Sequence, residues 1–337
     1  MIGERRWHAW ESVEIHRQLD SFSTVAITAP FEHDRAEFRE AFRPFSFTPA
    51  MVTAGGEVLF MGTVVDVNPA LDPSKRTVQA TAYSRPAVLA DVNPPSSAYP
   101  LELNGLKLKR IAETLVAPFG LEVVMDADEG APFRRVAIKP DQIVHSFLVE
   151  LAQQRGLVIS DTNFGALRFL KSDNGGAPVA QLKEGEPPLS AVNPTFSPRS
   201  YFSEITGLAK TRAGRGGSGH TEVNRHLTGV VRPHTFTLGD TDDADVPTAT
   251  KAKLGRMFGN MLAIGVDLPT WRDPSGKLWA PNTSLTLEAP GAMIYGPTRF
   301  LVRGVTLRQE AHSQSTTLDL VLPGAFSGEV PEELPWD

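Results

Sequence analysis

The sequence predicts an α+β protein, mainly β, in which two antiparallel β segments are separated by a small α/β domain. Glycine and proline make up 55 of the 337 residues, about 16% against a usual total of about 12%, and this excess favours short strands and turns. Apolar and polar residues alternate along residues 12–18 and 76–83, as they do in half-buried strands. Between residues 98 and 185 the apolar spacing changes to that of amphipathic helices.

The first β segment spans residues 1–97. Val13 and Ile15 lie on one face of a predicted strand, and residues 22–28 form its partner across an Asp20-Ser21 turn. A long apolar strand follows at 58–67, and the alternating strand at 76–83 comes next. This spacing indicates a small antiparallel barrel or sandwich. The proline-rich stretch at 93–97 ends the segment like a linker.

The second segment, residues 98–185, contains two helix–strand pairs. Gly120 ends a predicted helix as a C-cap and Gly156 ends another, which Asp141 caps at its start. A strand follows each glycine, at 121–125 and 157–160, and the second turns back into 166–170. The apolar stripes of the two helices are Leu108, Ile111, Ala112, Leu115 and Phe119, and Val144, Phe147, Leu148 and Leu151.

The third segment, residues 186–326, is predicted to be β again with one helical insertion near 247–263. Strands are expected within 189–208 and at 230–238, 264–268 and 285–287, with a final hairpin of 300–308 and 316–322. Asp273-Pro-Ser-Gly276 is typical of a type I turn. Residues 327–337 form an acidic C-terminal tail with four acids and no base, which we expect to extend unpacked from the last strand, either disordered or docked on a partner.

Composition excludes several classes of protein. There is no cysteine, which rules out a disulfide scaffold and thiolate metal sites and fits a reducing cytoplasm. The charged start is not predicted to be a signal peptide, and no apolar run is long enough to cross a membrane. The net charge is −6, or −2 without the tail; the first segment carries −3, and residues 186–337, tail included, carry −2. No basic stripe for wrapping nucleic acid is present.

Two loops carry weak motifs, each with two readings. The glycine-rich stretch 213–220 lacks the Lys-Ser/Thr pair of a phosphate-binding loop, so it is either a surface loop or a contact loop for a partner or nucleic acid. The stretch 240–245 begins like a calcium loop, but the glycine and glutamate of an EF-hand are absent. An acidic loop ahead of a helix is the simpler interpretation.

No residue is predicted to be catalytic, cofactor-binding or metal-binding, and no cofactor is expected. His220, His226 and His234 are spaced more widely than most zinc ligands. No GxSxG nucleophile motif occurs. Paired carboxylates of the glycosidase kind stay open, because their spacing is spatial. The tryptophans that flank the β segments favour core packing, with interface anchoring as the alternative: Trp7, Trp10, Trp271 and Trp279.

Several stretches resemble the Mu-like phage tail proteins that form the baseplate hub. Residues 7–23 (WHAWESVEIHRQLDSFS) are very similar to the start of these proteins. The resemblance continues in order along nearly the whole chain, through 111–120 (IAETLVAPFG), 147–165 (FLVELAQQRGLVISDTNFG), 276–282 (GKLWAPN), 300–308 (FLVRGVTLR) and 317–323 (TLDLVLP). The tail at 329–337 matches nothing in the family.

The resemblance implies a structural hub of a contractile tail and no enzyme. It implies two barrels like the tail-tube subunit, at 1–97 and 186–326, on either side of the α/β domain at 98–185. Three chains would then form a six-barrel ring that joins the sixfold tube to a threefold spike around the DNA exit channel. The hub region of type VI secretion spike proteins and of phage-tail-like bacteriocins is similar in design.

The implied partners are further copies of the chain in a homotrimer, the tail tube protein or tube terminator, the central spike, the wedge proteins and a tape-measure protein. DNA would pass through without specific binding, nothing would insert into a membrane, and the protein would reside in the virion after assembly in the host cytoplasm. A phage, a tailocin and another tail-like particle remain equally open as the source. The alternative function is a cell-wall-binding or peptidoglycan-hydrolysing tail protein.

Overall fold

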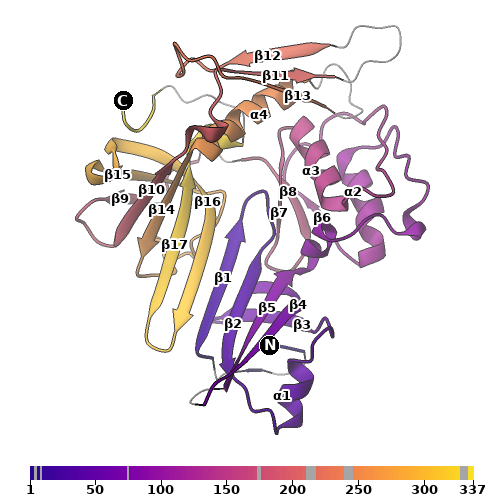
Figure 1. Cartoon of the computed structure of the whole chain (residues 1–337), viewed down its shortest axis with the longest axis vertical. Helices are drawn as coiled ribbons and strands as arrows, with labels where there is room; N and C mark the ends of the chain where they lie inside the picture. The colour runs from indigo at the N-terminus through magenta and orange to yellow at the C-terminus, as the bar shows by residue number, and fades with distance from the viewer. Residues whose placement is uncertain are drawn as a thin grey trace.

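One large antiparallel sheet runs through most of the molecule, and two small three-stranded sheets lie at its upper end (Figure 1). The computed structural model describes residues 1–3, 6–7, 10–73, 76–172, 176–209, 218–238, 246–326 and 333–337. The large sheet has eleven strands, nine of which follow the order β10-β14-β17-β16-β1-β2-β5-β4-β3.

The strands of the large sheet come from both ends of the chain. The first segment supplies β1 (Ser12–Gln18), β2 (Thr24–Pro30), β3 (Pro49–Ala54), β4 (Glu57–Leu71) and β5 (Arg76–Ser84). The later part of the chain supplies β9 (Gln181–Lys183), β10 (Ala191–Phe196), β14 (Leu262–Leu268), β15 (Ser284–Ala289), β16 (Ile294–Glu310) and β17 (Gln314–Val321). The predicted alternating strands at 12–18, 22–28 and 76–83 are therefore confirmed within one or two residues.

Strand β16 joins the two halves of the sheet. Its first half pairs with β15, and its second half pairs with β1 in an antiparallel register from Ser12↔Glu310 to Gln18↔Gly304. The resemblance described above predicts two separate barrels at 1–97 and 186–326. Among the described strands no sheet closes on itself, and β1 and β16 instead merge the two segments into one open sheet.

The buried side of the large sheet faces one continuous apolar core. Helix α1 (Ala36–Ala41) covers it in the first half, where Phe38 and Phe42 pack against Trp7. Helix α4 (Val246–Met261) covers it near the third-segment strands, with Phe258 fully buried. The largest side chains that are almost completely buried include Trp279, Phe60 and Phe300. Burial of such residues supplies the main stabilising term, at about 1.5–3 kcal/mol for each large apolar side chain.

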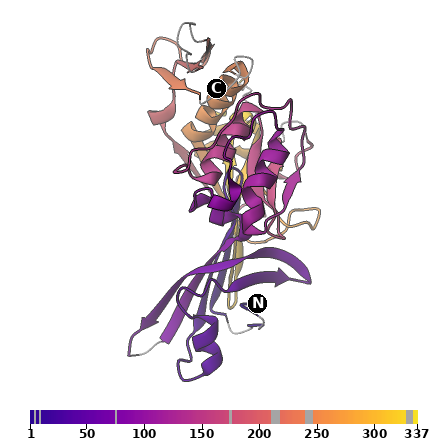
Figure 2. The same ribbon diagram turned by 90° about the vertical axis from the view of Figure 1, so that its right-hand side faces the viewer.

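The middle segment forms a compact α/β domain beside the top of the sheet (Figure 2). Helices α2 (Leu108–Val116) and α3 (Val144–Gln154) cover a small sheet of order β6-β8-β7, with β6 at Val123–Met125, β7 at Val158–Asp161 and β8 at Leu167–Leu170. Gly120 and Gly156 follow the helical segments with φ values of 63° and 66°, the left-handed conformation that glycine adopts most readily. Both predicted helix–strand pairs are confirmed. The predicted cap at Asp141 is wrong, because α3 begins after Ile143 and no side chain caps it. Short 3₁₀ helices connect this domain at Arg85–Ala90, Ser96–Ala98 and Ala117–Phe119.

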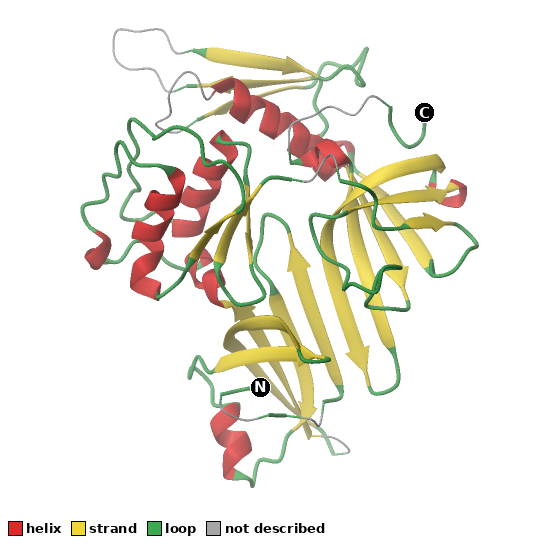
Figure 3. Cartoon of the chain, turned by 180° about the vertical axis from the view of Figure 1, so that it is seen from behind, coloured by secondary structure: helices red, strands yellow, loops and turns green. Residues whose placement is uncertain are grey.

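A second small sheet lies outside the large one. It has the order β12-β11-β13, from Gly219–Val223, Glu204–Leu208 and Pro233–Thr237, and α4 separates it from the large sheet (Figure 3). A side chain at Gly207 would place Cβ 2.3 Å from Thr250 Oγ1, so β11 packs closely on α4. The assignment of residues 204–208 and 233–237 to a second barrel is therefore wrong, although the predicted helix is present. Further 3₁₀ turns occur at Pro198–Ser200, Pro290–Ala292 and Pro323–Ala325.

The end of the acidic tail packs onto the chain. Leu334 is only 8% exposed and belongs to the main core, and the Trp336 ring lies edge-on to Phe196 at 5.3 Å. The Tyr295 amide donates a hydrogen bond to the Pro335 carbonyl. The expectation of an unpacked tail is therefore wrong for residues 333–337, because two apolar side chains in it find partners beside β10 and β16.

We expect Leu334→Ala to lower the melting temperature by several degrees. The substitution removes a buried side chain worth about 2–5 kcal/mol in well-packed cores, and each kcal/mol shifts Tm by about 2–4 °C in larger domains. Differential scanning calorimetry measures the shift. Glu333→Ala, at an exposed neighbouring position, is the control that should leave Tm within about a degree. An unchanged Tm for Leu334→Ala would contradict the packing of the tail.

Candidate assembly surface

The large sheet has one polar face that continues across the junction of its two halves. The strand registers align Asp267, Thr317, Thr306, His16, Thr24 and Tyr83 in one row across six neighbouring strands. A second row aligns Ser315, Arg308, Glu14, Ala26, Thr81 and Asp66. Strand residues alternate between the two faces, so the buried neighbours of these residues point to the core and the rows themselves form an open wall. We call this wall the polar face.

Side chains of the polar face bond to one another across the strands. Thr317 Oγ1 donates to Asp267 Oδ1 at 2.7 Å, and His16 Nδ1 lies 3.0 Å from Thr306 Oγ1. Arg308 donates from Nε and Nη2 to Glu14 Oε2 at 2.9 and 2.6 Å, which raises the pKa of the guanidinium. Charge-assisted contacts of this geometry hold the two side chains against each other.

The charge balance of the polar face is acidic. Near the two rows its carboxylates are Glu14, Asp66, Asp267, Glu310 and Asp319, and its guanidiniums are Arg303 and Arg308. Farther along β16, β15 and β9 the same face also carries Arg299, Glu288 and Lys183. Arg303 and Arg308 each lie within 4 Å of a carboxylate of the face. Phosphate binding depends on unpaired basic side chains that release counterions, so this face is built to repel a polyanion more than to hold it.

The turn between β1 and β2 is where the large sheet, the α/β domain and α4 meet. The Leu19 amide donates to the Arg303 carbonyl of β16, and the Asp20 amide donates to the Ile159 carbonyl of β7. Asp20 also lies 3.3 Å from Arg256 Nη2 of α4. A separate apolar cluster closes around the same turn, formed by Leu19, Val158, Leu170, Leu301, Val321, Ala325 and Phe326.

A buried carboxylate fixes the α/β domain to this turn. Asp161, 7% exposed, accepts hydrogen bonds from the Ser23 amide at 3.1 Å and the Ser23 hydroxyl at 2.8 Å. Burial raises the pKa of Asp161, while the Ser23 hydrogen bonds and the charge of Arg17 act in the opposite direction. Satisfied polar groups in such a position specify one arrangement of the parts, because an unpaired partner would be costly.

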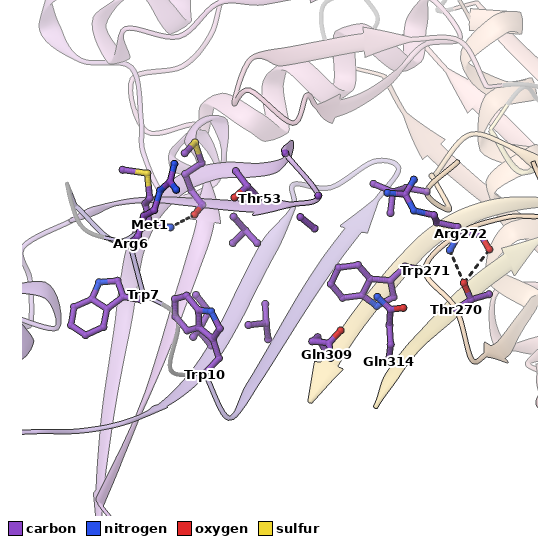
Figure 4. A pocket seen from close by; sticks show the side chains of 18 residues that line it. Met1, Arg6, Trp7, Trp10, Thr53, Thr270, Trp271, Arg272, Gln309 and Gln314 are labelled. Atoms are coloured by element: carbon purple, nitrogen blue, oxygen red, sulfur yellow. Dashed lines mark hydrogen bonds between the residues drawn. The ribbon is translucent and has the colours of Figure 1, made fainter. Parts of the chain in front are cut away.

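A cavity of about 610 Å³ opens at the lower end of the junction between the two halves (Figure 4). Trp7, Trp10 and Trp271 line it together with Arg6 and Arg272. Trp271 Nε1 donates to the Arg308 and Ser315 carbonyls at 3.0 Å, so this ring is part of the core. No aspartate or glutamate occurs among the described residues of its wall, so the described wall offers no carboxylate pair for glycosidase chemistry.

The other residues singled out in the sequence do not form a common site. His220 Nε2 lies 2.7 Å from Glu222 Oε1, the His234 ring stacks on Phe202, and the His226 ring packs edge-on to Phe258. Within the described ranges no three histidine, aspartate or glutamate side chains are grouped as metal ligands would be. The stretches 210–217 and 239–245, with most of the glycine-rich and all of the acidic motif, lie outside the described residues.

The tryptophans near the C-terminal strands are buried, whereas the two near the N-terminus are only half-buried. Trp279 is 1% exposed and Trp271 is also buried, as core packing predicts. Trp7 and Trp10 are half-buried and pack against the main core beside the cavity.

No helix in the described part of the chain is long and apolar enough to cross a membrane.

Comparison with known proteins supports the resemblance carried by the sequence motifs. Residues 87–171 match the family model described as baseplate hub protein gp44-like, second domain. The middle segment is similar to that domain. The chain is 22% identical over 320 residues to baseplate hub protein gp44 of Escherichia phage Mu, an alignment that covers 90% of this chain and 81% of that protein. The predicted resemblance to the Mu-like hub proteins is thus confirmed.

Solved structures share the fold. The 43 kDa tail protein of prophage MuSo2 from Shewanella oneidensis superposes with a TM-score of 0.81 at 24% identity, covering 96% of this chain and 98% of that one. A tail protein from Neisseria meningitidis MC58 also gives 0.81, at 18% identity and with 97% and 96% coverage. An Escherichia coli component of the type VI secretion system gives 0.59, at 11% identity and with 96% and 76% coverage.

We expect mild acid to lower the stability of the protein by protonating His145, a residue of α3 at the contact between the α/β domain and the β1–β2 turn. Its ring packs on Phe22 at 4.7 Å with Nε2 buried and unbonded, and burial lowers the pKa of the imidazole. The unfolded chain binds a proton near pH 6.5, where the folded chain resists it, so stability falls as the pH drops through that value. The loss of Tm between pH 7.5 and 5.5 should be smaller for His145→Gln than for the wild type. His312→Gln, at an exposed position, is the control. An equal loss of Tm in all three proteins would contradict the role of His145 in the acid sensitivity.

Proposed function

We propose that this protein is the baseplate hub of a contractile phage tail or a related tail-like particle. The observation that carries the proposal is the similarity to the Mu hub protein over 90% of the chain, together with a fold shared with tail proteins over almost its full length. The role is structural: the chain supplies a stiff wall and defined contact surfaces, and it catalyses no reaction.

Three copies would form the hub ring. Each chain carries two halves of a continuous sheet, so three chains present six sheet halves to a sixfold tube and three equivalent positions to a threefold spike. Contacts that repeat head to tail close into a ring when the rotation is right. This arrangement makes the tail tube protein or tube terminator one neighbour and the central spike the other. The wedge proteins would surround the ring, and the tape-measure protein would occupy its centre before ejection.

The polar face would line the DNA channel of the ring. Its carboxylates outnumber its guanidiniums, and Arg303 and Arg308 are each paired with a carboxylate of the same face. A wall of this kind leaves few cations free for phosphate, so DNA slides past without being held. The site of action is the virion, after assembly in the host cytoplasm.

The assembly state provides the first test. Light scattering on the purified protein should give about three times 36.6 kDa, near 110 kDa, because an obligate ring buries large interfaces, about 2,000 Å² or more at each contact. The spike protein is added in a second run, to supply the threefold partner. A stable dimer, or a chain that stays at 36.6 kDa with and without the spike, would refute the ring.

The channel wall provides the second test. Filter binding at low salt should detect no double-stranded DNA retention at submicromolar protein. The triple variant Asp66→Lys/Asp267→Lys/Glu310→Lys leaves the Arg303–Asp319 and Arg308–Glu14 pairs intact and shifts the charge of the polar face by +6 per chain, because three negative charges are replaced by three positive ones. It should bind DNA with an affinity that falls steeply with salt. Submicromolar binding by the wild type would contradict a passive wall.

A further inference from the structure

Two phenylalanines project into solvent from the loop between α1 and β3. Phe45 is 92% exposed and Phe47 is 61% exposed, and the loop also carries the exposed Arg43. We call Phe45 and Phe47 the aromatic knob. Exposed aromatic pairs are uncommon on monomers and concentrate at interfaces, where aromatic side chains are enriched.

The backbone holds the aromatic knob in an unusual conformation. Phe45 and Phe47 have φ values of 60° and 49°, a left-handed region that bulky side chains rarely adopt. The Ser46 hydroxyl donates to the Arg43 carbonyl at 2.7 Å and lies 2.7 Å from Thr48 Oγ1, so local hydrogen bonds fix the loop. The exposed rings bury little apolar surface within their own chain, so this chain's contacts do not offset the cost of the strained backbone. Contact with a partner would bury the rings and offset that cost.

An apolar groove lies at the other end of the large sheet. It has a volume of about 470 Å³ and runs between β10 and the 3₁₀ turn at Pro290–Ala292, lined mainly by Leu189, Val192, Pro194, Phe196, Ala289 and Met293. We call it the β10 groove. Strand β10 is the last strand of the sheet path and pairs with β14 alone. Phe196 and Met293 are 41% and 54% exposed, so the groove presents apolar surface to solvent.

We propose that the aromatic knob of one copy of this chain inserts into the β10 groove of the next. The proposal rests on the ring described above and names the residues that would close it. In Figure 1 the knob's neighbours, α1 and β3, lie at the lower end of the molecule, and β9, β10 and β15 lie at the upper left. Two unlike, complementary surfaces at opposite ends of one chain are what a head-to-tail ring requires.

Charge supports the same pairing. Arg43 stands beside the knob, and the exposed Glu184 and Glu186 stand in the loop that borders the groove. Glu186 lies 3.8 Å from Lys183, and Glu184 accepts a hydrogen bond from the Gly291 amide at the groove wall, so the rim has a net negative charge of one. The knob would bring the positive charge of Arg43 to this rim while its rings fill an apolar centre. An apolar core with a polar rim is the usual composition of a specific interface. The end of the acidic tail, where Trp336 packs on Phe196, borders the same groove and helps to shape it.

Photo-cross-linking tests the contact directly. A benzophenone amino acid placed at position 45 of the full-length chain should cross-link, in the purified protein, to residues 184–196 or 289–293 of a second copy. Mass spectrometry locates the adduct, and the covalent dimer identifies it as intermolecular. The same group at position 164, where Phe164 is 66% exposed in the α/β domain, is the matched control. Adducts elsewhere, or none, would overturn the proposal.

The double variant Phe45→Ser/Phe47→Ser separates this inference from the ring itself. It should raise the trimer dissociation constant by roughly tenfold or more for each phenylalanine, and its mass should fall toward 36.6 kDa at concentrations where the wild type is trimeric. Phe164→Ser should leave the mass unchanged. If the wild type and the double variant are equally trimeric, the knob is not the contact and the hub proposal stands. If the wild type stays monomeric and no cross-link forms, both proposals fail.

Discussion

The pairing of β1 with β16 is the constraint on which the rest of this structure depends. Seven residue pairs join strands that lie almost 300 positions apart in the sequence. They turn two β segments into one sheet, and they align the polar rows of both halves into a single wall. The part of β16 that pairs with β15 ends at Leu301, and the part that pairs with β1 begins at Gly304. A register shift in the β16–β17 pairing, between Val302 and Gly304, lies at this boundary.

Local patterns predicted the elements well and their partners poorly. The alternation through Val13 and Ile15, and the glycine stops at Gly120 and Gly156, follow from contacts within a few residues, so they can be read from the sequence. The pairing of Ile15 with Leu307 is non-local, and no spacing rule encodes it. Two closed barrels were therefore expected where one open sheet exists. The placement of the strands at 204–208 and 233–237 in a second barrel is wrong for the same reason. A strand pattern in the sequence does not indicate which sheet the strand joins.

The candidate surfaces were only partly visible before the fold was known. Composition marked the tail as acidic, but charge counting overlooked Leu334 and Trp336, whose burial depends on Phe196 and Tyr295 of distant strands. The charge of −3 in the first segment agrees with the acidic polar face, but residues 186–326 carry +2, so the composition of the third segment did not indicate it. The aromatic knob gave no signal at all. Nothing in the sequence distinguishes Phe45 and Phe47 from other phenylalanines, because exposure and a left-handed φ are properties of the folded loop.

The β1–β2 turn explains how a domain inserted between the two β segments can belong to the same rigid body. The α/β domain lies between the halves in sequence, and it could swing if only its two connections held it. Instead Asp161 of β7 accepts two hydrogen bonds from Ser23, and Asp20 contacts both β7 and Arg256 of α4. Burying a carboxylate there costs desolvation energy, which raises the pKa of Asp161. Its hydrogen bonds offset that cost only when the domain is seated in one orientation, so the buried charge stabilises one arrangement of the domains over others.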